Sequence, residues 1–159
     1  MEVTTGYYQS PLGTLEIKVN TTAVISINFI PDITEKPFEN KQSEVLEKTI
    51  SQLEEYFTNN RRTFNLELKP EGTEFQLKVW NELTKIPYGE TISYLKLAEK
   101  VGSHLHTRAV GLANGKNPIA IIVPCHRVIG ASGELTGYAG GLWRKQWLLE
   151  HESMQGKLF

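Results

Sequence analysis

Residues 93–115, SYLKLAEKVGSHLHTRAVGLANG, predict two short helices joined by a tight turn. The first helix is expected over 93–101 and stops at Gly102. The second is expected over 106–114 and stops at Gly115, because glycine readily leaves the helical conformation. Two such helices form either a DNA-binding helix-turn-helix or an ordinary corner between packed helices. The residues alone favour the ordinary corner.

The rest of the second half of the chain is also predicted to be mostly helical. Thr73 and Gln76 have the spacing of a capping box, which marks the start of a helix. The turn at 87–89, Pro-Tyr-Gly, ends that helix. A last helix is expected over 141–151. The buried face of the first of these helices carries three apolar residues at helical spacing: Phe75, Val79 and Leu83.

The first half of the chain changes between strand and helix periods. Apolar residues alternate with polar ones over 15–19 and 25–29, which predicts half-buried strands of an antiparallel β-meander. Residues 43–58 have the period of an amphipathic helix. Alternation returns over 64–68 as a further strand, and the Lys-Pro-Glu-Gly sequence at 69–72 breaks the pattern.

The break at 69–72 gives the expected domain boundary. We predict a small domain over 1–71 and a mostly helical domain over 72–159, so the fold class is α+β. Residues 1–71 carry 7 basic and 11 acidic side chains, a balance of −4, and residues 72–159 carry 10 and 7, a balance of +3. The net charge of −1 hides this asymmetry, which directs any polyanion to the second half.

The sequence shows no targeting segment. The N-terminus has no basic stretch followed by an apolar run, so no secretory signal is expected. No apolar stretch approaches the roughly 18 residues of a membrane-spanning helix, so we expect no membrane association. A single cysteine cannot form an internal disulfide, and a free thiol survives in a reducing compartment. We therefore expect a cytoplasmic protein.

The one cysteine, Cys125, follows an apolar run at 119–123 and Pro124. A lone cysteine is most often a small buried hydrophobic residue. Pro124 is expected to end a buried strand over 119–123, since proline cannot donate to a sheet. The neighbouring His126 and Arg127 favour the thiolate over the thiol. The residues leave two interpretations open: a core residue and an activated nucleophile.

An activated Cys125 imposes two geometric conditions. Consecutive residues of a strand face opposite sides, so the chain must turn at Cys125, or a water must bridge, if His126 is to act on the thiol. His126 also needs an orienting carboxylate, and Glu150 and Glu152 on the last helix are the candidates. Such a Cys–His–acid set fits several chemistries, including those of cysteine hydrolases.

The segment PCHRVIG at 124–130, with NP at 117–118 before it and YAGG at 138–141 after it, resembles the active-site signature of the O6-alkylguanine-DNA alkyltransferases. The similarity covers most of residues 72–152. It includes three further segments: SYLKLA, TRAVGLANGKNP and KQWLLEHE. The first half matches this family only in size and in strand and helix order. The resemblance implies a ribonuclease H-like N-terminal domain and a winged-helix C-terminal domain.

The resemblance also implies the direct reversal of DNA damage, without a cofactor. Cys125 would take a methyl or small alkyl group from O6-alkylguanine, and from O4-alkylthymine, and keep it, so that each protein acts once. His126 would take the thiol proton through a water, Glu152 would orient His126, and Tyr94 would serve the ring nitrogen beside the lesion.

Further residues match the base pocket of the family. Asn117 would pin the turn that carries the cysteine, Tyr138 would wall the pocket, and the backbone N–H of Ala139 would meet the guanine oxygen. The backbone carbonyls of Cys125 and Val128 would accept from the exocyclic amine. The resemblance places six residues in this pocket: Asn117, Pro124, Val128, Tyr138, Ala139 and Lys145.

The implied partner is double-stranded DNA containing O6-alkylguanine, bound by a monomer. The damaged base must leave the duplex to reach a buried thiol. By resemblance, Arg108 fills the vacated space. The residues around it on the same helix, Thr107, Ala109 and Gly111, would contact DNA in the minor groove.

No metal is expected, and three other functions compete with the transferase. Some relatives hold a structural zinc with cysteine and histidine in the N-terminal domain, and residues 1–71 contain neither. The competing functions are a non-catalytic lesion binder, in which the cysteine is replaced, a winged-helix regulator, and a cysteine hydrolase. The number of alkyl groups transferred per protein separates them: one for the transferase, none for the binder and the regulator, and many for the hydrolase.

Overall fold

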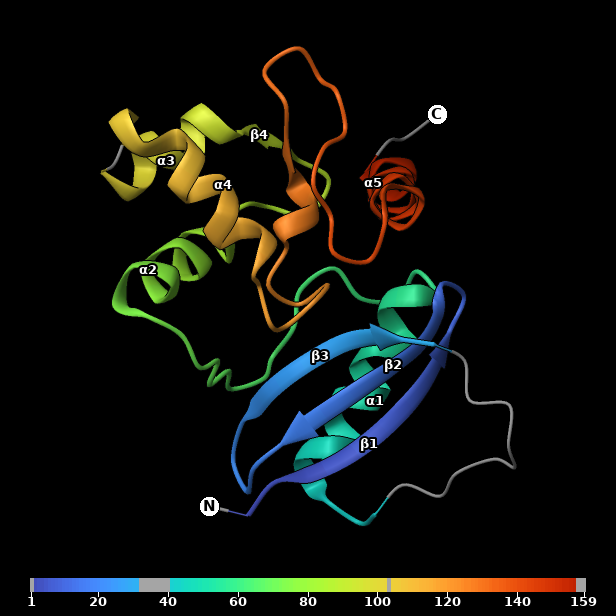
Figure 1. The fold of residues 1–159 in the computed structure, drawn as a ribbon. Coiled ribbons are helices and arrows are strands. Elements are labelled where there is room, and N and C mark those ends of the chain that lie inside the picture. The colour runs from blue at the N-terminus through green and yellow to red at the C-terminus, as the bar shows by residue number, and fades with distance from the viewer. Residues whose placement is uncertain (1, 32–40, 103, 157–159) are drawn as a thin grey trace. The chain divides into compact units, whose positions relative to one another are not determined.

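The computed structural model describes residues 2–31, 41–102 and 104–156 (Figure 1). The chain divides into two compact units, one of Met1–Glu71 with Pro118–Ala120 and one of Gly72–Asn117 with Ile121–Phe159. The short segment Pro118–Ala120 was expected in the second domain. It belongs to the first unit because Ile27 donates its N–H to the carbonyl of Pro118 and accepts from the N–H of Ala120, both at 2.9 Å.

The first unit is a three-stranded antiparallel sheet covered by one helix (Figure 1). Its strands β1 (Thr4–Ser10), β2 (Gly13–Val19) and β3 (Val24–Ile30) pair in sequence order. Helix α1 (Glu44–Phe57) contacts all three strands and begins at Ser43, whose side chain accepts from the N–H of Leu46. The predicted meander and amphipathic helix are confirmed. The sheet contributes five fully buried apolar side chains to the core: Leu15, Ile17, Val19, Val24 and Ile27.

The strand predicted over 64–68 is wrong except at one position. Leu68 makes a single parallel bridge to Val24, and no longer strand forms there. The side chain of Gln52 satisfies the backbone of Asn65 instead, because its amide donates to the carbonyl at 3.1 Å and its oxygen accepts from the N–H at 2.9 Å. A side chain on α1 therefore replaces the neighbouring strand that the alternation of residues predicted.

The second unit is mostly helical, as predicted, and this confirms the α+β class. Three of its helices pack on one another: α2 (Glu74–Leu83), α3 (Tyr94–Val101) and α4 (Thr107–Gly115). The capping box of Thr73 and Gln76 is present at the start of α2. Gly102 ends α3 in the left-handed conformation with φ 82°, which glycine adopts without strain. A 3-10 turn, η1 (His104–His106), leads into α4.

The second unit also contains a short sheet, a further turn and a last helix. A two-stranded parallel sheet joins β4 (Ile92–Ser93) to β5 (Val128–Ile129). A second 3-10 turn, η2 (Cys125–Arg127), directly precedes β5, and the last helix is α5 (Leu142–Gly156). No helix within the described residues is long and apolar enough to cross a membrane.

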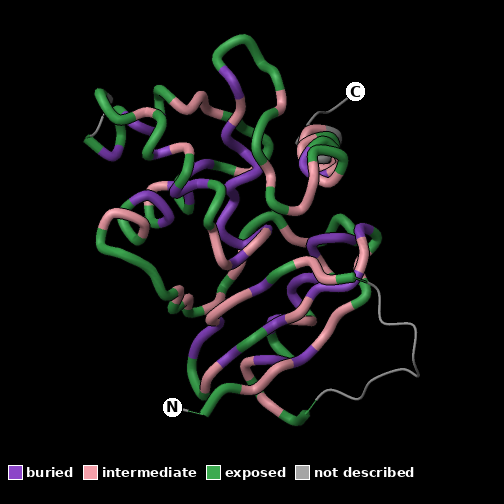
Figure 2. The backbone as a smooth tube through the Cα atoms, viewed as in Figure 1, coloured by how far each residue is buried: buried purple, intermediate pink, exposed green. Residues whose placement is uncertain are grey.

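The buried strand predicted over 119–123 does not form. Ile119 makes one isolated bridge to Ile27, and the chain then turns. Ile121 has φ 73°, a conformation that a β-branched side chain rarely adopts and that no regular strand contains. The predicted burial is nevertheless present, because residues 121–128 are all buried (Figure 2). The apolar run therefore forms a buried turn directly before Cys125 in the chain.

Candidate active site at Cys125

Cys125 lies at the start of a 3-10 turn that Pro124 precedes. The chain therefore turns at Cys125, as an activated cysteine requires. Cys125 and His126 are not in a strand, so their side chains need not point to opposite sides. Cys125 is buried, with 8% of its surface exposed. Its thiol forms a hydrogen bond with the side chain of Asn117 and lies in the electrostatic field of Lys145.

The resting form of Cys125 is the thiol. Burial raises the pKa of this thiol above its ordinary value of 9.0, although the Asn117 hydrogen bond and the Lys145 charge both act to lower it. The groups that favour the thiolate are Asn117 and Lys145 and not, as the sequence indicated, His126 and Arg127, whose side chains are directed to Glu152. Nucleophilic attack by Cys125 therefore requires a base that removes the thiol proton.

His126, Arg127 and Glu152 form a buried ion cluster. Glu152 on α5 places Oε2 2.7 Å from Nε2 of His126. The Arg127 guanidinium donates through Nε to Oε1 of Glu152 at 2.8 Å and through Nη2 to Oε2 at 3.1 Å. Its Nη1 donates to the carbonyl of Ile86 at 2.7 Å. Of the two candidate carboxylates, the structure brings Glu152 to His126, whereas Glu150 is exposed and accepts from Gln146.

The cluster sets the protonation of His126. Burial alone would raise the pKa of the Glu152 carboxyl, but the charges and hydrogen bonds of His126 and Arg127 hold it well below its usual range. Burial lowers the pKa of the His126 imidazole below 6.5, against the raising effect of Glu152. With the proton on Nε2, Nδ1 is an acceptor, and it has no hydrogen-bond partner among the described residues. Neutral His126 can therefore take up a proton at Nδ1.

Two asparagines brace the loop that carries the cysteine. Asn117 donates from its side-chain amide to the carbonyl of Val123 at 2.7 Å, and this places it at the turn as predicted. Asn114, which the sequence analysis missed, donates to the carbonyl of Cys125 at 3.4 Å. That carbonyl also accepts from the backbone N–H of Val128, so both of its lone pairs are engaged. The sequence contains one signal for Asn114: it is a polar residue four positions after Val110 and so lies on the same, buried face of the helix.

A groove of about 640 Å³ in the second unit gathers much of the predicted site. Residues 136–139 and helix α4 both line it. Cys125, His126 and Glu152 are not among its lining residues, and neither is Ala109. Six of the predicted residues line this groove: Tyr94, Thr107, Arg108, Gly111, Tyr138 and Ala139.

The other predicted pocket residues do not line this groove: Pro124, Val128 and Lys145 are buried, and Asn117 is half-buried. Lys145 on α5 is fully buried, and Pro124 and Val128 flank η2. The hydroxyl of Tyr138 is buried without a hydrogen-bond partner among the described residues. Burial and the nearby charge of Cys125 raise the pKa of this phenol well above 10.0. Lys145 and Tyr138 therefore share the electrostatic environment of the thiol.

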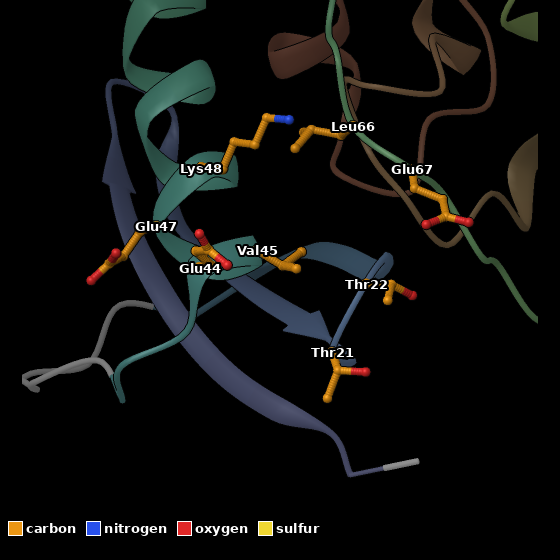
Figure 3. Close-up of a pocket in the computed structure, with 8 residues that line it drawn as sticks. All are labelled: Thr21, Thr22, Glu44, Val45, Glu47, Lys48, Leu66 and Glu67. Carbon is orange, nitrogen blue, oxygen red and sulfur yellow. The ribbon is translucent and has the colours of Figure 1, made fainter.

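A second hollow, of about 700 Å³, lies in the first unit (Figure 3). It is formed by the turn after β2 and the first turns of α1. Its charged lining is Glu44, Glu47, Lys48 and Glu67. No residue of the predicted site lies there. Within residues 2–31, 41–102 and 104–156, no group of three or more histidine, cysteine or acidic side chains could hold a metal ion.

Known proteins resemble this chain over both units. One family model, the 6-O-methylguanine DNA methyltransferase ribonuclease-like domain, matches residues 3–70, and a second, the DNA binding domain of the same family, matches residues 74–154. A methylated-DNA–protein-cysteine methyltransferase of Methanosarcina acetivorans is 46% identical over 150 residues, which is 91% of this chain and 95% of that protein. The protein of the same name from Mycobacterium leprae is 60% identical over 108 residues, 68% of this chain and 66% of its own length.

Solved structures show the same similarity. The crystal structure of Mycobacterium tuberculosis O6-methylguanine methyltransferase is 41% identical with a TM-score of 0.85, and the match covers 99% of this chain and 97% of that one. The structure of Mycobacterium tuberculosis OGT in complex with DNA is 44% identical with a TM-score of 0.84, covering 94% and 92%. Because the two family models span both units and the second contains the Cys125 turn, the chain belongs to the 6-O-methylguanine DNA methyltransferase family.

Proposed function

We propose that this protein repairs DNA by transferring a methyl or small alkyl group from O6-alkylguanine, and from O4-alkylthymine, to Cys125. The observation that carries this proposal is the buried turn in which Cys125 precedes His126, whose Nε2 is paired with Glu152. The relatives named methylated-DNA–protein-cysteine methyltransferase support the same activity. We place the activity in the cytoplasm, where a single thiol stays reduced.

The transfer begins with removal of the thiol proton. Nδ1 of His126 takes this proton through a bridging water, and the Glu152 carboxylate stabilises the imidazolium that forms. Arg127 keeps Glu152 ionised throughout, since it donates two hydrogen bonds to that carboxylate. The thiolate that results is stabilised by the hydrogen bond of Asn117 and the charge of Lys145.

The thiolate then attacks the alkyl carbon. A carbon–sulfur bond forms as the bond from that carbon to the guanine oxygen breaks, and the electron pair of the broken bond stays on the guanine. The hydroxyl of Tyr94 donates to the ring nitrogen, and the backbone N–H of Ala139 donates to the oxygen. The product is a thioether, which water does not cleave under these conditions. Each chain therefore acts once.

The groove receives the damaged base after it leaves the duplex. Helix α4 lies in the minor groove of the DNA, and Arg108 fills the space that the damaged base leaves in the duplex. Extrusion costs a few kcal/mol of unstacking, which the contacts of Arg108 and of the groove offset. The neighbouring Thr107, Ala109 and Gly111 are small, so the helix approaches the DNA closely. The protein acts as a monomer, as one lesion and one acceptor require no second copy.

One experiment tests this function against the three competing functions. The protein is mixed with an excess of duplex DNA that contains O6-methylguanine, and its peptides are analysed by mass spectrometry. We expect one methyl group per protein, on Cys125, with the lesion in the DNA converted to unmodified guanine. A Cys125→Ala variant should transfer none and still bind the lesion. Methyl on another residue, no transfer, or repeated turnover with release of methanol would each contradict the proposal.

A further inference from the structure

Thr136 holds the hydroxyl of Tyr94 by two hydrogen bonds. The Tyr94 hydroxyl donates to the backbone carbonyl of Thr136 at 3.0 Å, and the Thr136 hydroxyl donates to the Tyr94 oxygen at 3.2 Å. The two residues are 42 positions apart in the sequence, and both line the groove. One residue thus supplies both an acceptor and a donor to the phenol, and the sequence analysis did not select it.

Lys145 fixes Thr136 in turn. Its Nζ donates to the same Thr136 carbonyl at 2.7 Å and lies 5.8 Å from the centre of the Tyr94 ring. Lys145 is fully buried, and burial lowers the pKa of its ammonium group. The carbonyl of Thr136 therefore accepts two hydrogen bonds, one from Lys145 and one from Tyr94.

This arrangement suits an exchange of partners at Tyr94. When the phenol donates to the ring nitrogen of a bound base, its hydrogen leaves the Thr136 carbonyl. That carbonyl keeps the bond from Lys145, so it is not left without a donor although Thr136 itself is exposed. The Thr136 hydroxyl can continue to donate to the phenol oxygen, and such a donor stabilises the negative charge that grows there as the phenol proton shifts toward the base.

We propose that Thr136 is a positioning residue for the alkyl transfer: its hydroxyl supports the donation from Tyr94 to the departing guanine, while Lys145 keeps its carbonyl satisfied. The inference rests on the proposed transfer to Cys125. A purely structural Thr136 would hold the loop before α5 without affecting the leaving group, and the two roles predict different kinetics.

The test compares Thr136→Val with Thr136→Ser, each alone and combined with Tyr94→Phe. The single-turnover rate of methyl transfer is measured at saturating duplex that contains O6-methylguanine, and the dissociation constant of the duplex is measured separately. We expect Thr136→Val to slow transfer about two- to tenfold, the range of one neutral hydrogen bond, with little change in duplex binding. Thr136→Ser, which keeps the hydroxyl, should restore the rate. In the Tyr94→Phe background, Thr136→Val should slow transfer no further.

A second reaction separates chemistry from folding. Iodoacetamide alkylates Cys125 with loss of iodide, which needs no donor from Tyr94, so Thr136→Val should react with it at the wild-type rate. Thr84→Val, at the end of α2 and outside the groove lining, controls for the exchange of threonine for valine. If Thr136→Val does not fold, Thr136→Ala takes its place in every arm.

The outcomes distinguish this inference from the proposed function. If the wild-type protein transfers no methyl group to Cys125, the proposed function fails and this inference fails with it. If the wild-type protein transfers the group but Thr136→Val is as fast, only the inference is overturned. Equal slowing by Thr136→Val with Tyr94 intact and in the Tyr94→Phe background, or equal slowing with iodoacetamide, assigns Thr136 a structural role and also overturns it.

Discussion

Nε2 of His126 lies 2.7 Å from Oε2 of Glu152, at a place where the two side chains are 0% and 1% exposed. Arg127 joins the same carboxylate, so a single acidic residue balances the charge of one cation and orients one base. The stability of the second unit and the chemistry of Cys125 therefore depend on the same group.

Replacing Glu152 with glutamine should destabilise the protein strongly. Glu152→Gln leaves the buried Arg127 without its counter-ion, and breaking a buried ion pair on one side costs about 3–5 kcal/mol. Glu150→Gln is the matched control on the same helix, where an exposed change is within about 0.5 kcal/mol. Urea denaturation of the three proteins measures both effects. Similar small losses in the two variants would show that the cluster does not stabilise the fold.

Stability should fall as the pH drops below about 6.5. The folded state lowers the pKa of His126, so the unfolded chain binds a proton that the folded chain does not. The stabilising contribution is therefore present above 6.5 and declines as the pH falls, by at most about 1.4 kcal/mol per pH unit for one proton. Glu152, whose pKa is also depressed, adds a second loss below its ordinary 4.5.

Variants at two histidines check this assignment. His126→Gln should remove the decline between pH 6.5 and 4.5, whereas His151→Gln, at a half-buried histidine stacked on Trp147, should retain it. Melting curves over this pH range suffice. A decline that persists in His126→Gln would assign it to another group.

The Cys125 thiol should ionise above pH 9.0, since burial raises its pKa. Asn117→Leu and Lys145→Met each remove an interaction that favours the thiolate, so both should move the ionisation to still higher pH. Lys85→Met, at an exposed lysine paired with Glu82, is the control and should leave it unchanged. The rate of iodoacetamide alkylation against pH measures the midpoint, and the single cysteine makes the signal specific. A downward movement in either variant would contradict this electrostatic picture.

Arg108→Ala should slow repair of duplex DNA far more than repair of a free O6-alkylguanine base. Only the duplex requires extrusion of the base, and unstacking costs a few kcal/mol. Tyr94→Phe should slow both reactions, because it removes a contact to the leaving group. Transfer rates on the two substrates give the comparison. Equal losses for Arg108→Ala on both would show that the residue does not assist extrusion.

Methylated protein should melt at a lower temperature than unmodified protein. The alkyl group enters a buried site that is braced by Asn114 and Asn117, and overpacking of a core typically costs about 1–3 kcal/mol. Bulkier groups should enlarge the effect. Thermal melts of unmodified, methylated and benzylated protein test this, and a midpoint that is constant or rises across the series would rule it out.

Local signals allowed much of this structure to be predicted. The capping box of Thr73 and Gln76 depends on residues three apart, and both of its hydrogen bonds form. Local residues also indicated Cys125 and His126, but they left Glu150 and Glu152 open, and only the family resemblance favoured Glu152. That choice depends on which helix face turns toward η2, and tertiary packing sets it.

The features that sequence analysis missed depend on distant partners or on unusual backbone. Residues 64–68 alternate like a strand, yet Gln52 takes the backbone bonds of Asn65 from 13 positions away. The run at 119–123 is as apolar as a buried strand, but Ile121 has a left-handed backbone. Arg127 pairs with Glu152 across 25 positions, a contact that the spacing of Cys125 and Arg127 in the sequence could not indicate.

The segment Pro118–Ala120 has a consequence for how such a protein can be divided. The chain completes about half of its second unit, contributes three residues to the first unit, and returns at Ile121 shortly before the acceptor cysteine. A fragment that ends at Glu71 would leave the edge of β3 without these hydrogen bonds, and the complementary fragment would carry them unsatisfied. Recombination at that boundary would therefore not yield two interchangeable modules, because each half would lack backbone partners that the other supplies.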